Sequence, residues 1–398
     1  MAFALLAICA LLAVHPLVTY PLSLRLFPRA RAKRAASGGN DAPRKTLAIC
    51  MCAYNEEQVI RSKMERLLDI ARAYGPATVH VYADAPTDGT AAILAEFTDR
   101  ADIVFGTERA GKTIGMNLLA ARSQSEYMLF TDANVESEVD VAVELANALA
   151  DPSVGCATAR LIYSNSRESP TSTLGALYWS VEEAIKRLES RSVGLIGCDG
   201  AMFMMRRSLH VSPPPDLIDD LYLSLSILIA RSRIVSIDHV RVFERSATAA
   251  DEEKRRKQRI ACQAWNVHRA LWPQLRKLPI MPLYAYLSHR PIKWLMPFFV
   301  GGAALSALAL VGLLLGLLPM LVIAGVTAVG FVIGGLFSIP PFSLIHSATL
   351  SLYGVAIGFI ESFWLRKTYT IWKPAMSVRA VTAPPTAAGQ GATTPGDE

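Results

Sequence analysis

The central part of the chain alternates between two patterns of apolar positions. Continuous apolar runs, which are typical of buried strands, occur at residues 46–52, 79–84, 101–106 and 126–132. Segments with apolar residues at helical spacing lie between them, at residues 56–74, 88–97 and 112–123. Strands that alternate with helices predict βαβ units. We therefore expect an α/β domain with a mostly parallel sheet over residues 44–275.

The N-terminal end of the chain is much more hydrophobic than the middle. Residues 1–24 form an apolar stretch of the length that spans a bilayer, and Pro16 and Pro21 are expected to kink this helix. A cluster of arginine and lysine residues follows within a basic linker, residues 25–43. Because basic flanks stay in the cytosol, we expect the central domain to be cytosolic and the N-terminus to lie outside.

The C-terminal end is also hydrophobic. Residues 276–295 mix aromatic, proline and basic residues, as an interfacial segment does, and residues 296–365 predict a transmembrane region of about three helices. Three complete crossings would place the basic segment 366–374 outside, against the positive-inside rule. Either one segment is re-entrant or interfacial, or the rule fails locally. Residues 366–398 are expected to form a polar, disordered tail.

Composition agrees with this division. The mean hydropathy of +0.30 is high for a soluble enzyme, and the excess comes from the two ends. The net charge of +6 comes largely from the linker and from KRRKQR at residues 254–259, which favours a membrane surface or phosphate groups. No basic stripe is interleaved with aromatic residues, which argues against nucleic acid. The six cysteines lack metal-binding spacing and predict reduced thiols in preference to a disulfide or a zinc site.

Residues 106–113, GTERAGKT, match the P-loop pattern of nucleoside triphosphatases at every fixed position. A predicted strand precedes this loop and a predicted helix follows it, as the pattern requires. Three features argue against an ATPase. The loop follows the third strand, the acid that would assist magnesium, Asp132, comes only one helix after Lys112, and the other strand ends carry polar clusters of their own. The ATPase interpretation remains an alternative, and it predicts ATP binding that depends on Lys112.

The polar clusters stand at the ends of the first four predicted strands. They are CAYNEE at 52–57, ADAPTDGT at 83–90, ERAGKT at 108–113 and FTDANV at 130–135. Ligands of parallel sheets bind beyond the carboxyl ends of the strands. Asp84, Lys112 and Asp132 should therefore converge on one site.

This ordered set of motifs resembles the family 2 glycosyltransferases, which have the Rossmann-like GT-A fold, over about residues 46–270. The flanking membrane segments resemble those of the polysaccharide-synthase branch. The resemblance implies an inverting transferase in the inner membrane that uses a nucleotide sugar, UDP-linked in particular, and Mg²⁺ or Mn²⁺. It further implies a growing exopolysaccharide as acceptor and an export partner protein.

The resemblance also assigns roles on the donor side. Tyr54 and Glu56 lie in the motif that contacts the uridine, and Asp84 in the motif that holds the base. Lys112 is expected near the nucleotide. Asp132 and Asn134 occupy the metal motif D-x-D, in which Asn134 replaces the second acid. Such a metal neutralises the charge of the diphosphate leaving group, and a neutral amide should bind it more weakly than a carboxylate.

On the acceptor side, Asp199 and Gly200 lie in a segment that resembles the one shaping the acceptor site. Asp219 and Asp220 resemble an acidic motif at the start of a helix, whose second acid is the catalytic base, with Asp219 orienting it. The helix KRRKQRIACQAW stands where processive synthases have Q-x-x-R-W, and we expect its residues Arg256, Arg259 and Trp265 near the acceptor and diphosphate. Simple helix caps at Asp132 and at Asp219–Asp220, and a solvated basic helix, are the structural alternatives.

Two further functions remain open at this stage. The acceptor is a polyprenyl phosphate or another lipid in one of them, and a lipid phosphate is already ionised and needs no base. The other is an inactive nucleotide-binding partner in a larger synthase, which the Asn134 substitution leaves open.

Overall fold

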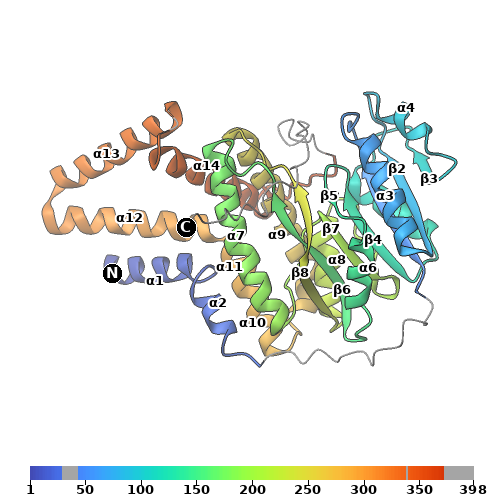
Figure 1. The fold of residues 1–398 in the computed structure, drawn as a ribbon. Coiled ribbons are helices and arrows are strands. Elements are labelled where there is room, and N and C mark those ends of the chain that lie inside the picture. The colour runs from blue at the N-terminus through green and yellow to red at the C-terminus, as the bar shows by residue number, and fades with distance from the viewer. Residues whose placement is uncertain (29–43, 338, 372–398) are drawn as a thin grey trace, which may run out of the picture.

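A mixed sheet forms the centre of the protein (Figure 1). The computed structural model describes residues 1–28, 44–337 and 339–371. Within them the strands are β1 Leu47–Ala53, β2 Ala77–Ala83, β3 Asp102–Phe105, β4 Tyr127–Asp132, β5 Glu136–Ser137, β6 Val154–Tyr163, β7 Met202–Arg206 and β8 Arg233–Glu244. Their order across the sheet is β3-β2-β1-β4-β7-β6-β8-β5.

The first half of the sheet is parallel, as the sequence pattern predicts. Strand β1 pairs in parallel with β2 and with β4, and β2 pairs in parallel with β3. The connecting helices are α3 Ile60–Tyr74, α4 Thr90–Ala95 and α5 Lys112–Arg122. Helix α3 begins at residue 60, and not at 56, because the preceding residues form a turn at the strand end.

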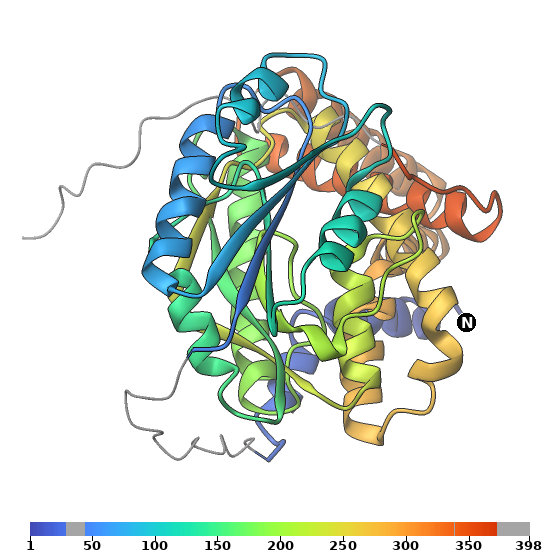
Figure 2. The same cartoon turned by 90° about the vertical axis from the view of Figure 1, so that its right-hand side faces the viewer.

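The second half of the sheet is mixed. Strand β7 runs antiparallel to both of its neighbours, β4 and β6, whereas β8 is parallel to β6 and antiparallel to the short β5. The helices of this half are α6 Val141–Ala148, α7 Pro170–Arg191, α8 Asp219–Ile229 and α9 Ala250–Leu275, with a 3-10 turn at Arg207–Leu209. Figure 2 shows helices on both sides of the sheet. The whole is the predicted α/β GT-A arrangement, with an antiparallel strand inserted beside β4.

Alternating side chains of the strands build a core on each face. Ile49 and Met51 of β1 point to one face and pack in a cluster with α3 and α6. Ala48 and Cys50 point to the other face and pack in a cluster with α5 and α8. Helices cover both faces of these strands, so both alternating sets of side chains are apolar. The buried strands are therefore continuous apolar runs in the sequence, not alternating ones.

A third core joins the domain to short helices that precede and follow it in the chain. It contains Tyr20 from α2 (Thr19–Leu24), Val267 from α9 and Tyr286 from α10 (Ile280–His289), all fully buried. The short helix α11 (Pro291–Trp294) adds Trp294 to the same cluster. The interfacial segment predicted at 276–295 is therefore helical and packed against the α/β domain.

The N-terminal apolar stretch forms two helices instead of one. Helix α1 covers Ala2–Val14, and the break before α2 falls at residues 15–18, beside the predicted kink at Pro16. At about 1.5 Å per residue, the 13 residues of α1 fall short of the roughly 30 Å hydrocarbon core. The basic linker is described only at residues 25–28, and the rest of it lies outside the described residues.

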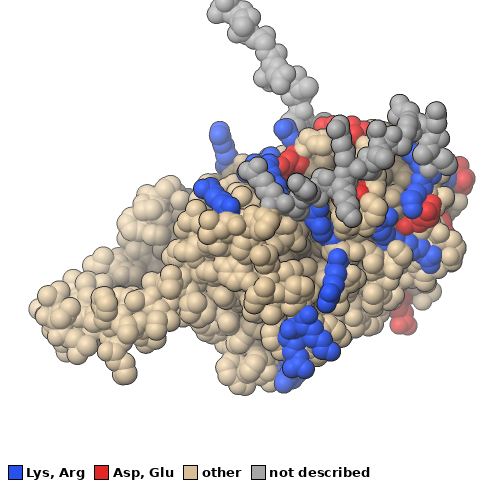
Figure 3. All heavy atoms as spheres, turned by 90° about the horizontal axis from the view of Figure 1, so that it is seen from below, with Lys and Arg blue, Asp and Glu red and all other residues tan. Residues whose placement is uncertain are grey.

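Three C-terminal helices in the described part of the chain are long and apolar enough to cross a membrane. They are α12 Met296–Leu315, α13 Leu317–Leu336 and α14 Phe342–Phe363. Helices α12 and α13 project away from the sheet, with α1 beside α12 (Figure 1). This projection carries no Lys, Arg, Asp or Glu on the face seen in Figure 3.

Helix α14 differs from the other two, because it packs along α9 of the domain. A Cβ on Gly354 would lie 2.5 Å from the carbonyl oxygen of Lys254, and one on Gly358 would lie 2.2 Å from that of Gln258. Both positions therefore require glycine for the two helix backbones to approach this closely. One of the three predicted spans is thus held against the polar domain over much of its length.

Candidate functional site

Residues from both halves of the chain meet at the carboxyl edge of the parallel strands. Asp132 ends β4, Lys112 begins α5, and Asp219 begins α8. The Lys112 ammonium nitrogen lies 2.7 Å from Asp132 Oδ1 and 3.6 Å from Asp219 Oδ2. The acidic pair of the second half is therefore brought to the same place as the strand-end motifs of the first half.

Asp220 lies in the same cluster, next to Asp219. Its Oδ1 accepts a hydrogen bond of 2.5 Å from the backbone N–H of Leu221. Burial and the neighbouring charge of Asp219 raise the pKa of Asp220 to about 7, although Lys112 and the Leu221 N–H lower it. A carboxylate with a pKa near neutral can accept a proton during a reaction at physiological pH.

Gly200 leaves the space that this cluster needs. A Cβ at this position would lie 3.1 Å from Asp220 Oδ2 and 3.4 Å from Lys112 Nζ. Its neighbour Asp199 is held differently, by an ion pair of 2.6 Å with Lys186 of α7. The predicted acceptor-side segment thus brings Gly200 to the acidic cluster, whereas Asp199 pairs with Lys186 of α7.

Lys112 is held positive by its surroundings. Burial alone would lower the pKa of Lys112, but the carboxylates of Asp132, Asp219 and Asp220 together raise it above its ordinary value. The lysine is therefore a permanent cation among three acids. It can neutralise an anionic group at this edge of the sheet or be displaced by one.

The GTERAGKT loop does not hold its backbone amides open for a phosphate. The N–H groups of Ala110 and Gly111 donate to the carboxylate of Asp84, at 2.7 Å and 3.1 Å. Arg109 adds a charged contact of 3.0 Å to the same carboxylate. A P-loop needs these amides for the triphosphate. The match to the ATPase pattern is therefore explained by a loop that wraps around Asp84.

Tyr54 and Glu56 lie in the turn after β1, beside this loop. The Arg109 guanidinium stacks 3.3 Å from the centre of the Tyr54 ring. The backbone N–H of Glu56 donates to the Thr90 hydroxyl at 2.7 Å, which ties the first strand-end motif to the second. In that second motif, Asp88 accepts from the Thr90 N–H at 3.0 Å, just before α4.

Asp132 and Asn134 lie in a loop that is anchored from behind by a buried lysine. Lys63 of α3 donates to the Thr131 hydroxyl at 3.0 Å and to the Val135 carbonyl at 2.5 Å. Burial lowers the pKa of Lys63 to about 7, although Asp132 opposes this shift. At helical spacing Lys63 lies on the apolar face of α3, between Ile60 and Leu67, but no strand-end motif includes it.

Glu244 is a second residue that the motifs did not single out. It ends β8, and its Oε1 accepts a hydrogen bond of 3.2 Å from the Asn134 amide. Burial, and to a smaller extent Asp132 and Asp199, raise the pKa of Glu244 to about 7, while Arg256 and the Asn134 hydrogen bond lower it. A polar residue at a strand end was the available signal, because the same rule identified the other clusters.

Helix α9 brings two arginines toward these acids. Glu253, Tyr163 and Glu244 together raise the pKa of Arg256 against the lowering effect of burial. Burial and Arg256 lower the pKa of Arg259 to about 10, while the charges of Asp220, Asp132 and Asp219 oppose the shift. The charge of Arg259 therefore interacts with the acidic cluster and that of Arg256 with Glu244, so a purely solvated basic helix does not describe this segment.

Trp265 is not brought to the cluster. Its ring packs against those of His268, Trp294 and Phe359, at centroid distances of 5.1, 5.6 and 4.9 Å. These partners come from α9, α11 and α14. The tryptophan thus belongs to an aromatic cluster between the domain and the apolar helices, because it lies two turns further along α9 than Arg259.

The chain returns to the site after α14. The Gln263 amide donates to the Tyr369 carbonyl and the Asn266 amide to the Lys367 carbonyl, both at 2.9 Å. A Cβ on Gly111 would lie 2.3 Å from the Thr370 carbonyl oxygen, and Gly111 has a positive φ of 93°. Residues 366–371 therefore lie between α9 and the Asp84 loop. The predicted tail beyond residue 371 lies outside the described residues.

The oxygen atoms available here suit a hard divalent cation. Among the described residues no group of three or more His, Cys, Asp or Glu could hold a metal ion. Mg²⁺ commonly uses only one or two protein carboxylates and takes its other ligands from phosphates and water. Asp132 offers one carboxylate, and Asn134, two residues further on, offers an amide carbonyl, so these two residues can hold a metal together with a diphosphate.

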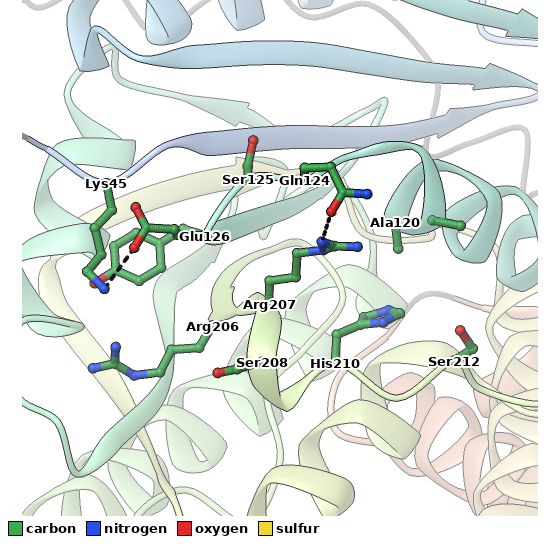
Figure 4. A pocket seen from close by; sticks show the side chains of 12 residues that line it. Lys45, Ala120, Gln124, Ser125, Glu126, Arg206, Arg207, Ser208, His210 and Ser212 are labelled. Carbon is green, nitrogen blue, oxygen red and sulfur yellow. Dashed lines mark hydrogen bonds and ion pairs between the residues drawn. The ribbon is translucent and has the colours of Figure 1, made fainter.

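A separate cavity lies at the opposite edge of the sheet (Figure 4). It has a volume of about 540 Å³ and is lined in part by Lys45, Glu126, Arg206, Arg207 and His210. Its charged groups pair with each other or with the chain, as Lys45 does with Glu126 at 3.1 Å and Arg207 with Gln124 at 3.0 Å. Ligands of parallel strands bind at their carboxyl ends, so this cavity is not the candidate site.

The comparison with protein families agrees with the motifs. Residues 48–211 match the model of the family described as glycosyl transferase family 2. The resemblance inferred from the strand-end motifs is therefore confirmed over this segment, which includes the Asp84, Lys112, Asp132 and Gly200 positions. Asp219, Asp220 and helix α9 lie after the matched residues. A search of curated proteins found no match.

A solved structure shows the same fold. The mannosyltransferase PcManGT from Pyrobaculum calidifontis, in complex with GDP-Man and Mn²⁺, is similar with a TM-score of 0.69 and 19% identity, over 92% of this chain and 100% of that chain. TarS residues 1–349 of S. aureus give a TM-score of 0.43 and 13% identity, over 81% and 93% of the chains. Glucosyl-3-phosphoglycerate synthase from Mycobacterium tuberculosis, with Mn²⁺, UDP and its product, gives 0.40 and 15%, over 58% and 81%. The first of these establishes a shared fold.

Proposed function

We propose that the protein is a membrane-integrated, inverting glycosyltransferase that transfers a sugar from a nucleotide sugar, UDP-linked in particular, to a growing exopolysaccharide. One observation carries the proposal. Asp220, with a pKa raised to about 7, lies beside a permanent cation and a metal-type acid at the carboxyl edge of a GT-A sheet. That combination supplies a base for the acceptor and positive charge for a diphosphate leaving group.

The donor is held at the first three strand ends in this proposal. Asp84 accepts from the base, and Tyr54 and Glu56 line the same side. Support comes from the similar mannosyltransferase, which binds GDP-Man and Mn²⁺, and from the synthase that binds UDP. Arg109 stacks on Tyr54 and pairs with Asp84, so it must shift when a base enters.

The diphosphate lies next to Asp132 in this proposal. A bound Mg²⁺ or Mn²⁺, held by Asp132 and Asn134, would neutralise the charge that develops on the leaving group. Lys112 supplies a second cation from within the chain, and Arg256 and Arg259 approach from α9. With a metal on the Asp132 carboxylate, Lys112 would be free to contact the phosphate.

Asp220 acts as the general base. It removes the proton from the acceptor hydroxyl as that oxygen attacks the anomeric carbon from the face opposite the diphosphate, which inverts the configuration. Burial and the charge of Asp219 raise the pKa of Asp220, whereas the charge of Lys112 lowers it. Gly200 leaves room for the acceptor beside the carboxylate.

Helices α12 and α13 serve as a membrane hairpin in this proposal, with α1 beside them. Helix α14 lies at the boundary between membrane and domain, because its glycines fit against α9. Residues 366–371 then stay on the cytosolic side, which removes the conflict with the positive-inside rule. A cysteine at Thr368 in inside-out inner-membrane vesicles should react with an impermeant maleimide, whereas labelling only in spheroplasts would contradict this topology.

The test of the function itself is a donor screen with the purified full chain. UDP-sugars and GDP-sugars are incubated with Mn²⁺ and a mixed glycan acceptor, and product is followed by mass spectrometry. A sugar added to the glycan supports the proposal. Nucleoside diphosphate release without any glycosylated product, or ATP hydrolysis in its place, would overturn it.

A lipid-phosphate acceptor is the second candidate, and the position of α14 against α9 favours keeping it. Such a nucleophile is ionised and needs no base. Transfer to a polyprenyl phosphate that survives Asp220→Asn would therefore favour the lipid, whereas loss of transfer to a hydroxyl acceptor favours the polymer.

A further inference from the structure

The replacement of the second metal-motif acid by Asn134 leaves a gap that another residue can fill. An amide side chain has two unlike ends, and only its carbonyl end can bind a cation. A free amide can turn either end toward the metal. The affinity of an asparagine site therefore depends on whatever fixes the direction of the amide.

Glu244 is placed to fix it. A carboxylate can only accept hydrogen bonds, so the Asn134 group that contacts Glu244 Oε1 at 3.2 Å must be the NH₂ end. The carbonyl oxygen is then the end that remains for a cation beside Asp132. We propose that Glu244 is a positioning residue of the metal site, which holds the Asn134 amide with its carbonyl oxygen toward the cation.

The strand pairing makes this contact a rigid one. The two-residue strand β5 directly follows the Asn134 loop and pairs antiparallel with β8, with Glu136 opposite Phe243. This register brings the residues before β5 alongside the end of β8, where Glu244 stands. On its other side Glu244 pairs with Tyr163 of β6, and its carbonyl accepts from the Ser164 N–H at 3.0 Å. Glu244 is thus fixed by two neighbouring strands.

Arg256 completes the arrangement from α9. Its charge and that of Glu244 attract each other, so Glu244 connects the loop that carries the metal-type residues with the basic face of α9. Groups that orient metal ligands in this way typically change metal affinity by about 10- to 100-fold when removed. The inference rests on the proposed metal-dependent function and adds a residue to it.

The experiment measures Mn²⁺ binding directly, by electron paramagnetic resonance of free Mn²⁺, with UDP or GDP present at pH 8. Glu244→Ala should weaken Mn²⁺ binding by about 10-fold or more. Asn134→Asp replaces the amide by a group with two equal oxygen ends, so its direction no longer matters. In the Asn134→Asp background, Glu244→Ala should therefore no longer weaken Mn²⁺ binding. The double variant and Asn134→Asp alone should have Mn²⁺ affinities that agree within about twofold.

Asn165 and Glu168 provide a matched control. The Asn165 amide donates to Glu168 Oε2 at 3.1 Å, outside the site, so Glu168→Ala removes the same type of contact. It should leave Mn²⁺ affinity unchanged. If Glu244→Ala lowers Mn²⁺ affinity equally with Asn134 and with Asn134→Asp, Glu244 is a direct ligand and the positioning role is wrong. Unchanged Mn²⁺ affinity in Glu244→Ala would also overturn the positioning role. Absence of Mn²⁺ binding to the unmodified protein would instead refute the metal-dependent function itself.

Discussion

The charge of Lys112 controls the proton affinity of Asp220, and a methionine at position 112 tests this. A Cβ on Gly200 would lie 3.4 Å from Lys112 Nζ and 3.1 Å from Asp220 Oδ2. The two charged groups are therefore at most about 6.5 Å apart. At an effective dielectric constant of about 20, two unit charges at that distance interact by about 2.5 kcal/mol, or about 2 pKa units. Solvent at the partly open site reduces the shift to between about 1 and 2 units.

The assay is the pH dependence of kcat/KM for sugar transfer, which reports groups of the free enzyme. The base must be ionised, so wild-type activity should fall as the pH drops through about 7, the pKa of Asp220. Because Lys112 lowers that pKa, Lys112→Met should move this acidic limb upward, to about 8–9. Overall activity will also fall, but only the position of the limb is interpreted.

A control on the same helix separates this effect from a general change of charge. Arg122 ends α5 and pairs with Asp102 at 2.8 Å, at the surface, so Arg122→Met should leave the limb at about pH 7. Glu244 also has a pKa near 7, but burial raises it and Arg256 is the charge that shifts it most. A limb that stays in place in Lys112→Met would therefore mean that Asp220 is not the titrating base.

Three further variants test other parts of the account. Gly200→Ala places a methyl group 3.1 Å from Asp220 Oδ2, so kcat should fall at least about tenfold while the melting temperature changes little; full activity would contradict the role of this space. Asp84→Ala removes the acceptor of the Ala110 and Gly111 amides and should abolish UDP-induced thermal stabilisation, and a retained shift would exclude the base contact. Gly358→Val forces a side chain toward the Gln258 carbonyl and should separate α14 from α9. Hydrogen exchange in α9 should then become faster. The control Gly301→Val, at a position where no described atom lies within 4 Å of an added Cβ, should leave that exchange unchanged.

The parallel half of the fold followed from the sequence because its signal is local. Buried parallel strands are continuous apolar runs, and the helices between them have a period of their own. The antiparallel insertion of β7 beside β4 has no such signal, since the pairing joins residues about 75 positions apart and depends on the whole fold. For the same reason the meeting of Lys112 with Asp219 followed only from the family resemblance.

The residues that the sequence did not identify act from outside the motifs. Lys63 shares the buried face of α3 with Ile60 and Leu67, but its spacing does not show that it reaches the Val135 carbonyl after β4. Glu244 ends a strand that lies far along the chain from Asn134, and the short β5 brings the two together. Trp265 shows the converse. Its motif position predicts a place near the acceptor, but the geometry of α9 directs its ring into an aromatic cluster.

The central claim is that Asp220 is the base of a sugar transfer, and one paired measurement tests it most directly. The purified full chain is incubated with its nucleotide sugar, Mn²⁺ and a hydroxyl acceptor, and nucleoside diphosphate release is compared with that of Asp220→Asn and of Asp216→Asn. Asp216 precedes the same helix and serves as the matched control. We expect Asp220→Asn to lose at least about 100-fold in kcat, which is the smaller end of the range for a general base, while Asp216→Asn keeps its activity. Turnover by Asp220→Asn equal to that of the wild type would contradict the account.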